Sequence, residues 1–216
     1  MLNIQSYNGY YNKANINFTG RKIDVCKLRN IPNFMEIEAN GIRGEALSSP
    51  KNIKYLYPLR SSGIDTVIDL RGKFGSEKYP QLCQKLGLRY VNIPIDSAEI
   101  SSREIIENLP NLFRIIDKDN YYIACAMGLH RTDIALALNY LYNPVEHKIP
   151  QMKGHFRNGQ FKYDDILRRI NSINKELTPS DLKQLGWDKD FQEVFKKRKK
   201  QFIEFNESIA KSSANM

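Results

Sequence analysis

Short apolar runs alternate along the middle of the chain with longer segments in which apolar residues recur every three or four positions. The short runs are rich in β-branched and aromatic residues and predict buried strands at 66–70, 89–93 and 121–124. The longer segments predict helices at about 49–62, 76–86, 101–117 and 131–142. A strand followed by a helix, three times over, predicts an α/β domain with a central, largely parallel sheet of four or five strands and helices on both faces.

Two of the predicted helices begin with clear capping signals. Ser49 precedes Pro50, which is a favourable residue at the first position of a helix. Ser101 and Glu104 have the spacing of a capping box, in which each side chain accepts a hydrogen bond from the backbone of the other. These signals place the helix starts independently of the apolar periodicity.

The two ends of the chain lack the strand–helix alternation. The first twenty residues contain five Asn and three Tyr and have no apolar core of a secretory signal. Residues 145–161 are polar, contain one Pro and two Gly, and predict a loop. Helical periodicity returns at 164–175, after 178, and from about 188. We therefore expect a disordered lead-in at 1–22, a core at 23–143, and a loop with a C-terminal helical extension of the same domain at 144–216.

The charge balance narrows the class of partner. Thirty-three basic and 24 acidic residues give a net charge of +9, which favours anionic partners. One run in the last predicted helix is entirely basic: Lys196, Lys197, Arg198, Lys199 and Lys200. Such a run is most often a solvated helix face, and the alternative is a weak contact with an anionic surface. No aromatic and basic face and no recognised motif indicates nucleic-acid binding.

Cysteine and histidine usage bears on compartment and cofactors. Cys26, Cys83 and Cys125 are odd in number and do not form a disulfide framework, so we expect a reducing, cytoplasmic location, with export as an effector left open. No apolar run reaches the roughly 18–20 residues of a transmembrane segment. His147 and His155 have no metal-ligand partners at useful spacing. We expect both to be surface residues, and we expect no metal and no cofactor.

The stretch that carries candidate chemistry runs from Cys125 to Thr132, between a predicted strand and a predicted helix. The N–H groups that enter a helix face such a loop, the helix dipole favours an anion there, and a cysteine in this field ionises more readily. We predict Cys125 as the nucleophile, Arg131 as a two-pronged clamp on phosphate oxygens, and Thr132 as a donor to the sulfur. The remaining cradle for the phosphate is expected from the loop itself: Ala126, Met127, Gly128, Leu129 and His130.

The spacing Cys-x2-Gly-x2-Arg-Ser/Thr is specific, because it arises by chance on the order of once in a thousand chains of this composition. Cys83 provides an internal comparison. Arg89 follows it at the same offset, but the glycine is one place late and the segment runs from helix to strand, which is the wrong order. Cys83 is therefore expected to be a core residue. A buried structural cysteine is the plainer alternative for Cys125.

The loop resembles the signature of the dual-specificity and related protein tyrosine phosphatases, and the likeness extends over about 40–142. Segments 42–47 and 63–71 are similar to the opening of bacterial tyrosine phosphatases of this superfamily. The Gly-x-His-Arg-Thr ending of the loop resembles the plant and fungal atypical dual-specificity group, some of which act on inositol pyrophosphates. The chain departs from the family at two positions. Ala124 stands where a His usually helps to set the acidity of the thiolate, and Asp133 stands where Gly is common.

Phosphoester cleavage needs a proton for the leaving oxygen and then a base that activates water. The resemblance implies that the general acid lies on the loop after the second predicted strand. Asp96 stands there, and Glu99 is a weaker substitute. A solvated turn aspartate is the plainer interpretation of Asp96. Arg71 either lines the rim of the pocket or pairs with Asp69. His130 either contacts substrate or orients the loop.

Taken together, these features predict a cysteine-dependent phosphatase that hydrolyses phosphomonoesters through a phosphocysteine intermediate. The neutral side chains of the loop favour phosphoproteins, as in a phosphotyrosine or dual-specificity phosphatase. The histidine of the loop favours the alternative, a phosphoinositide or inositol (pyro)phosphate phosphatase. A catalytically weak phosphate-binding module is a further alternative, because the usual histidine before the cysteine is missing. Sulfur transferases and arsenate reductases also use a cysteine loop, but they have no evident need for Asp96.

Overall fold

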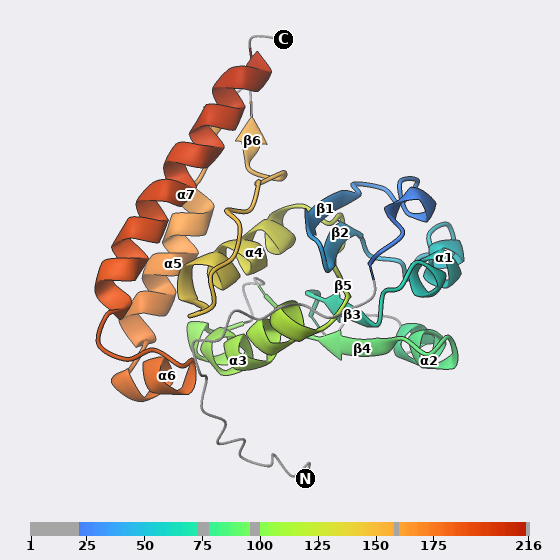
Figure 1. The fold of residues 1–216 in the computed structure, drawn as a ribbon, viewed down its shortest axis with the longest axis horizontal. Helices are drawn as coiled ribbons and strands as arrows, with labels where there is room; N and C mark the ends of the chain where they lie inside the picture. The colour runs from blue at the N-terminus through green and yellow to red at the C-terminus, as the bar shows by residue number, and fades with distance from the viewer. Residues whose placement is uncertain (1–21, 73–77, 96–99, 158–159, 215–216) are drawn as a thin grey trace.

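The computed structural model describes residues 22–72, 78–95, 100–157 and 160–214, and a five-stranded sheet lies at its centre (Figure 1). The strands are β1 (Met35–Glu38), β2 (Gly41–Glu45), β3 (Thr66–Asp69), β4 (Arg89–Asn92) and β5 (Tyr121–Cys125). Their spatial order is β1-β2-β5-β3-β4. β1 and β2 are antiparallel, and the other neighbours are parallel. The predicted largely parallel sheet is confirmed, with β5 as its central strand.

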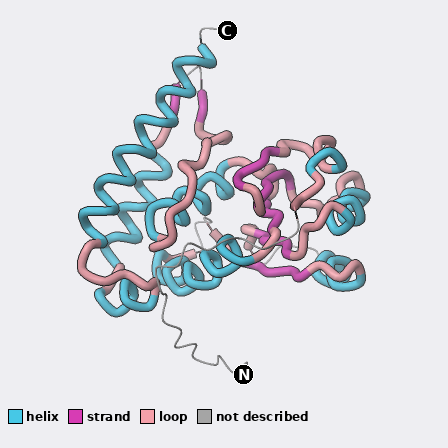
Figure 2. Tube along the Cα trace, viewed as in Figure 1, coloured by secondary structure: helices cyan, strands magenta, loops and turns pink. Residues whose placement is uncertain are grey.

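Helices cover both faces of this sheet (Figures 1 and 2). They are α1 (Leu56–Ser61), α2 (Lys78–Lys85), α3 (Ser102–Lys118), α4 (His130–Tyr142), α5 (Asp164–Glu176), α6 (Pro179–Gln184) and α7 (Phe191–Ala214). α1 and α2 pack on one face, and α3 and α4 pack on the other. α5 and α7 lie outside α3 and α4, against which they pack. The central strand is therefore enclosed from both sides.

The alternation of side chains along β5 explains the two apolar clusters. Tyr121, Ile123 and Cys125 point into the cluster formed with α3, α4, α5 and α7. Tyr122 and Ala124 point into the opposite cluster, with α1 and α2. All five residues of β5 are buried, as expected of a central strand in a parallel sheet. Cys125 is the last residue of this strand, so the chain leaves the sheet at that point.

The capping signals had different outcomes. The Ser101–Glu104 capping box is present at the start of α3, and a second box links Thr178 to Asp181 at the start of α6. The predicted helix start at Ser49 was wrong. Its hydroxyl accepts a hydrogen bond from the Asn52 N–H at 3.3 Å, but a turn and a short 3₁₀ helix (Ile53–Tyr55) precede α1.

Two pairs of strands were not predicted. β2 contains two glycines and an arginine, residues that are seldom enriched in strands, yet it is held between β1 and β5 by pairing on both sides. The predicted loop at 145–161 contains a hairpin of β6 (Phe156–Arg157) and β7 (Gln160–Phe161), and β7 lies against α7. Both pairs depend on tertiary contacts, because an isolated two-stranded hairpin is marginal in water.

Arg198 does not belong to a solvated basic face. It is only 8% exposed, and its guanidinium donates hydrogen bonds to the backbone oxygens of Tyr140 at 3.1 Å and Asn143 at 2.5 Å. The same group lies over the ring of Trp187. The basic run is thus interrupted by a residue that anchors α7 to α4, whereas Lys196, Lys197 and Lys200 are exposed.

The prediction that His147 and His155 lie on the surface was wrong, since His155 is buried and the side chain of the half-buried His147 is only 7% exposed. The ring of His147 lies between Asp117, at 2.9 Å, and Glu38, at 3.2 Å. Burial alone would lower the pKa of His147, but hydrogen bonds to these two carboxylates outweigh it and raise the pKa to about 9. Within the described residues, no helix combines the length and the apolar character needed to cross a membrane.

Candidate active site

Cys125 lies at the carboxyl end of the central strand, where ligands of parallel α/β sheets commonly bind. The residue is 3% exposed, and the loop that follows it leads directly into α4, which begins at His130. Ala126 and Met127 are exposed, Leu129 is half-buried, and Gly128 is buried. The predicted strand–loop–helix context of the cysteine is therefore confirmed.

Backbone oxygens of the loop accept hydrogen bonds from donors in other segments, and the oxygen of Cys125 also accepts one from the Gly128 N–H within the loop at 3.3 Å. The oxygen of Cys125 accepts a hydrogen bond from the N–H of Ala46 at 3.0 Å. The oxygen of Met127 accepts one from the side-chain amide of Asn33 at 2.9 Å. Because a peptide unit that turns its oxygen outward turns its N–H inward, these contacts favour a cradle of N–H groups.

Arg43, on β2, holds the second half of the loop in the same way. Its guanidinium donates to the oxygen of Gly128 at 2.8 and 3.2 Å and to the oxygen of Leu129 at 3.0 Å. Its side chain is completely buried, so these bonds form out of competition with water. Arg43 thus fixes two consecutive peptide units of the candidate phosphate cradle without facing its interior.

The N–H groups of the loop stabilise the thiolate of Cys125. Burial alone would raise the pKa of this thiol, but hydrogen bonds from the Thr132 hydroxyl, the Thr132 N–H and the N–H groups of Leu129 and Met127 outweigh it. The result is a pKa below the ordinary value for cysteine. A lowered pKa of this kind is what a nucleophilic cysteine requires, and it distinguishes Cys125 from Cys83, whose pKa is raised by burial.

Thr132 lies in the first turn of α4, and its hydroxyl is buried. Among the described residues this hydroxyl has no partner at ordinary hydrogen-bond geometry, yet it lowers the pKa of Cys125. A hydroxyl hydrogen rotates freely about its C–O bond, so it can turn to the sulfur when the thiolate forms. This is the role that the sequence predicts for Thr132.

Gly128 is required by both its conformation and its surroundings. Its φ of +66° lies in the left-handed region that side chains disfavour. A Cβ at this position would overlap the backbone of Gly44 on β2. The loop therefore packs backbone against backbone on the neighbouring strand, and only glycine allows that approach.

Ala124, where the family usually carries a histidine, faces away from the cysteine. Its side chain is buried in the cluster formed with α1 and α2, on the opposite face of the sheet from Cys125. The lowered pKa of Cys125 comes from the loop and Thr132, none of which involves position 124. Thiolate stabilisation in this chain is thus built without that histidine.

Arg131 and His130 open α4 beside the cradle. Arg131 is half-buried and has no acidic partner among the described residues, so its fork is available for an anion. His130 is exposed, and its ring makes an edge-on contact with the ring of His155, with 5.1 Å between the centroids. Asp96 and Glu99, the candidates for the acid, lie outside the described residues.

Asp69 and Arg71 form an ion pair, as in the second of the two interpretations of Arg71. The guanidinium binds both oxygens of the buried Asp69 carboxylate, at 2.9 and 2.7 Å, and also donates to the Ser48 hydroxyl at 2.7 Å. The hydrogen bond to Asp69, against the opposing effect of burial, raises the pKa of Arg71. Arg71 supports the end of β3, and its contacts with other described residues do not include the cradle.

Asp133, the second departure from the family pattern, is the centre of a buried polar network. Its carboxylate lies 2.6 Å from Arg43 and 2.8 Å from His155, and it accepts hydrogen bonds from the N–H groups of Lys153 and Gly154. Burial alone would raise the pKa of Asp133, but the bond from His155 and the charge of Arg43 outweigh it and lower the pKa. Asp133 thereby links Arg43, which holds the loop, to Lys153 and Gly154 in the segment that follows α4.

Gly154 shows how closely this segment packs on the loop. A Cβ on Gly154 would come within 2.8 Å of the backbone nitrogen of His130 and 3.0 Å of the backbone carbon of Leu129. The sequence analysis missed both the network and this contact. An aspartate at the start of a helix that is otherwise apolar was a usable signal, because a buried carboxylate needs a cationic partner.

We expect alkylation to separate Cys125 from Cys83. Iodoacetate should modify Cys125 in the folded protein with a pH midpoint below the ordinary thiol value, because the cradle stabilises its thiolate. Cys83 should stay unmodified at neutral pH, since burial and the charge of Asp69 raise its pKa to about 12. Peptide mapping by mass spectrometry against pH gives each rate. A midpoint at or above about 8.5 for Cys125 would contradict an activated nucleophile.

Arg43→Met should lower the stability of the fold and should also make the thiolate of Cys125 less stable relative to the thiol. Leaving Asp133 without this partner should lower the free energy of unfolding by about 3–5 kcal/mol, measured by urea denaturation. The alkylation midpoint of Cys125 should rise, because the oxygen of Gly128 loses its guanidinium donor and the oxygen of Leu129 keeps only the N–H of Asp133.

The double variant Arg43→Met/Asp133→Leu separates the two effects. Replacing a buried ion pair by apolar residues can be nearly neutral, so most of the stability should return. The midpoint for Cys125 should remain raised, since the oxygens of Gly128 and Leu129 still lack the guanidinium of Arg43. A double variant with the wild-type midpoint would show that Arg43 does not position the loop.

No protein-family model matches the sequence, and no curated protein matches it. Solved structures that resemble the fold include a DUF442 protein of Shewanella putrefaciens, with a TM-score of 0.47 and 16% identity over 81% of this chain and 98% of that one. The core catalytic domain of the PP-IP phosphatase SIW14 from S. cerevisiae has a TM-score of 0.43 and 13% identity over 78% and 94%. Tk-PTP in its active form has a TM-score of 0.44 and 13% identity, over 76% of this chain and 97% of that one.

Proposed function

We propose that this chain is a cysteine-dependent phosphatase that hydrolyses phosphomonoesters through a phosphocysteine intermediate. The observation that carries the proposal is the buried Cys125 thiol, whose pKa is lowered by the N–H groups of Met127, Leu129 and Thr132 and by the Thr132 hydroxyl. The same N–H groups surround the place where a phosphate would meet the sulfur. Arg131, which has no acidic partner among the described residues, supplies a planar fork for two of the phosphate oxygens.

In the proposed first step, the Cys125 thiolate attacks phosphorus and the bond from phosphorus to the leaving oxygen breaks. The leaving oxygen takes a proton, which we assign to Asp96 from its place in the sequence alone. In the second step, water attacks the phosphocysteine and loses a proton to the same carboxylate, and the sulfur departs as a thiolate. Thr132 stabilises the thiolate before the first step and after the second.

The proposal is tested by turnover of para-nitrophenyl phosphate and by rapid-quench mass spectrometry of the intact protein. Wild-type protein should release nitrophenol and show a transient mass increase of one phosphoryl group on Cys125. Asp96→Asn should lose activity on substrates with a poor leaving group and retain more on nitrophenyl phosphate, whose leaving group needs no proton. Binding of phosphate with neither turnover nor adduct would instead establish the non-catalytic binding module.

The chemistry of the loop alone leaves two substrate classes. Ala126, Met127 and Leu129 bring no charge to the cradle, which favours phosphoproteins and a phosphotyrosine or dual-specificity activity. The exposed ring of His130 at the loop's end favours a more highly phosphorylated substrate, such as an inositol (pyro)phosphate. The groups that surround the loop in space, rather than those within it, must discriminate between these classes.

A further inference from the structure

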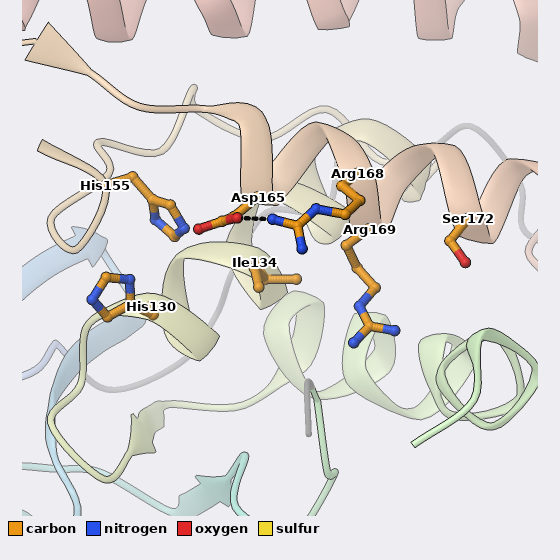
Figure 3. Close-up of a pocket in the computed structure, with 7 residues that line it drawn as sticks. All are labelled: His130, Ile134, His155, Asp165, Arg168, Arg169 and Ser172. Carbon is orange, nitrogen blue, oxygen red and sulfur yellow. Dashed lines mark hydrogen bonds and ion pairs between the residues drawn. The ribbon is translucent and has the colours of Figure 1, made fainter. Parts of the chain in front are cut away.

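A cavity of about 500 Å³ lies between α4 and α5 and reaches the candidate phosphate cradle at His130 (Figure 3). His130 and Ile134, one turn apart on α4, line it from one side. Its other walls come from the segment before α5 and from α5 itself: His155, Asp165, Arg168, Arg169 and Ser172. A volume of this size suits a small molecule rather than an extended peptide.

Two arginines from consecutive positions of α5 line this cavity, and Asp165 is the acidic residue among its described lining residues. Figure 3 shows Arg168 and Arg169 on the α5 side of the cavity, apart from His130 and His155. Arg168 pairs with Asp165 on the previous turn, and the two side chains are 77% and 58% exposed. Such an exposed pair is worth at most about 1 kcal/mol, so Arg168 can exchange this partner for a more strongly charged anion.

The cavity supplies the charge that the loop lacks. The side chains between the cysteine and His130 are neutral, so a second anionic group on a substrate finds no cation within the loop. The cavity wall begins at His130, which directly precedes Arg131 in the chain, and continues to the two arginines. Contact between the rings of His130 and His155 holds this wall together.

We infer that this cavity is a second anion subsite, in which Arg168 and Arg169 bind a further phosphate group of a small, multiply phosphorylated substrate. The inference rests on the proposed function, since it requires one phosphate in the Cys125 cradle. The guanidinium groups recognise the second phosphate by charge-assisted, forked hydrogen bonds. The donor set is the same for a soluble polyol phosphate and for the headgroup of a phosphorylated lipid.

The test compares substrates that share one skeleton and differ by one phosphate. We would measure kcat/KM for inositol 1-phosphate and inositol 1,4-bisphosphate with wild-type protein and with Arg168→Gln/Arg169→Gln. The bisphosphate should be preferred by wild type, and the double variant should lose on the order of 10- to 100-fold on it, mainly through KM. The monophosphate and para-nitrophenyl phosphate should change by no more than about twofold, because they leave the subsite empty.

A charge-matched control comes from α2, on the other face of the sheet. Lys78→Gln/Lys85→Gln removes the same two charges from exposed positions and should leave both inositol phosphates unaffected. An equal loss on the bisphosphate in this control would show that only net charge matters and would overturn the subsite. A loss on mono- and bisphosphate alike in the arginine variant would overturn it too.

Two further measurements distinguish a soluble polyol phosphate from a lipid headgroup as the ligand. Loss of activity on the soluble bisphosphate assigns a soluble substrate, and loss confined to vesicles that contain phosphatidylinositol 4-phosphate assigns a lipid headgroup. A loss confined to singly phosphorylated peptides would overturn the small-molecule subsite. The proposed function fails by a separate result, which is absence of nitrophenyl phosphate turnover by wild-type protein.

Discussion

Cys125→Ser should abolish turnover of para-nitrophenyl phosphate, with a loss on the order of 10⁴-fold or more. A serine hydroxyl in this cradle stays protonated at neutral pH, so the N–H groups that stabilise the thiolate of Cys125 have no anionic nucleophile to stabilise. Binding of phosphate or vanadate should remain, because the backbone cradle and Arg131 are unchanged. Initial rates and isothermal titration with vanadate give the two quantities separately.

The matched control is Cys26→Ser, which makes the same substitution at an exposed cysteine outside the cradle. It should leave both turnover and vanadate binding at wild-type values. Near-normal turnover by Cys125→Ser would rule out the nucleophile assignment. Loss of vanadate binding together with turnover would indicate that the substitution disturbs the loop, so that the role of the sulfur would not have been measured.

Arg131→Lys should lower kcat/KM by about 10²–10³-fold. An ammonium group provides a single point of charge, whereas the guanidinium binds two phosphate oxygens at once through a rigid fork. Arg131 is half-buried beside the cradle and has no acidic partner among the described residues, so no structural ion pair is lost in the change. Steady-state kinetics with para-nitrophenyl phosphate measures the loss.

Arg60→Lys is the corresponding control, because Arg60 forms an exposed ion pair with Asp65 that lysine can also make. That variant should retain full activity and nearly full stability. The alkylation midpoint of Cys125 should stay below its ordinary value in Arg131→Lys, since the hydrogen bonds that lower the pKa come from Met127, Leu129 and Thr132. An Arg131→Lys enzyme within a few-fold of wild type would exclude a forked phosphate contact.

The distant residues that support the thiolate act through the backbone of the loop rather than by contact with the sulfur. Arg43 and Asn33, which are far from the loop in sequence, hold three of its backbone oxygens outward. Asp133 orients Arg43 through their ion pair. The side chain of Ala124 lies on the opposite face of the sheet from Cys125 and does not contact the sulfur. Ala124, at the position where the phosphatases that the loop resembles usually carry a histidine, is therefore compatible with a stabilised thiolate, and the alkylation experiment measures that directly.

Local patterns predicted a large part of the fold. The strands at β3, β4 and β5 and the helices at α3 and α4 follow from runs of apolar residues and from caps, which act over a few residues. β1 and β2 have no comparable signal, because β2 is stabilised by pairing with β5, some 80 residues away, and β1 by pairing with β2. The buried Arg198 was missed for the same reason, since composition does not show which backbone oxygens α7 meets.

The sequence by itself determined the chemistry of the loop. Cys125, Gly128, Arg131 and Thr132 lie within eight residues, so their spacing between a strand and a helix is enough to predict the cradle. Only the tertiary structure decided what holds that cradle and what surrounds it: the contacts from Asn33, Arg43 and His155, and the arginines of α5. These groups come from segments distant in sequence, and their meeting depends on how the sheet and helices pack.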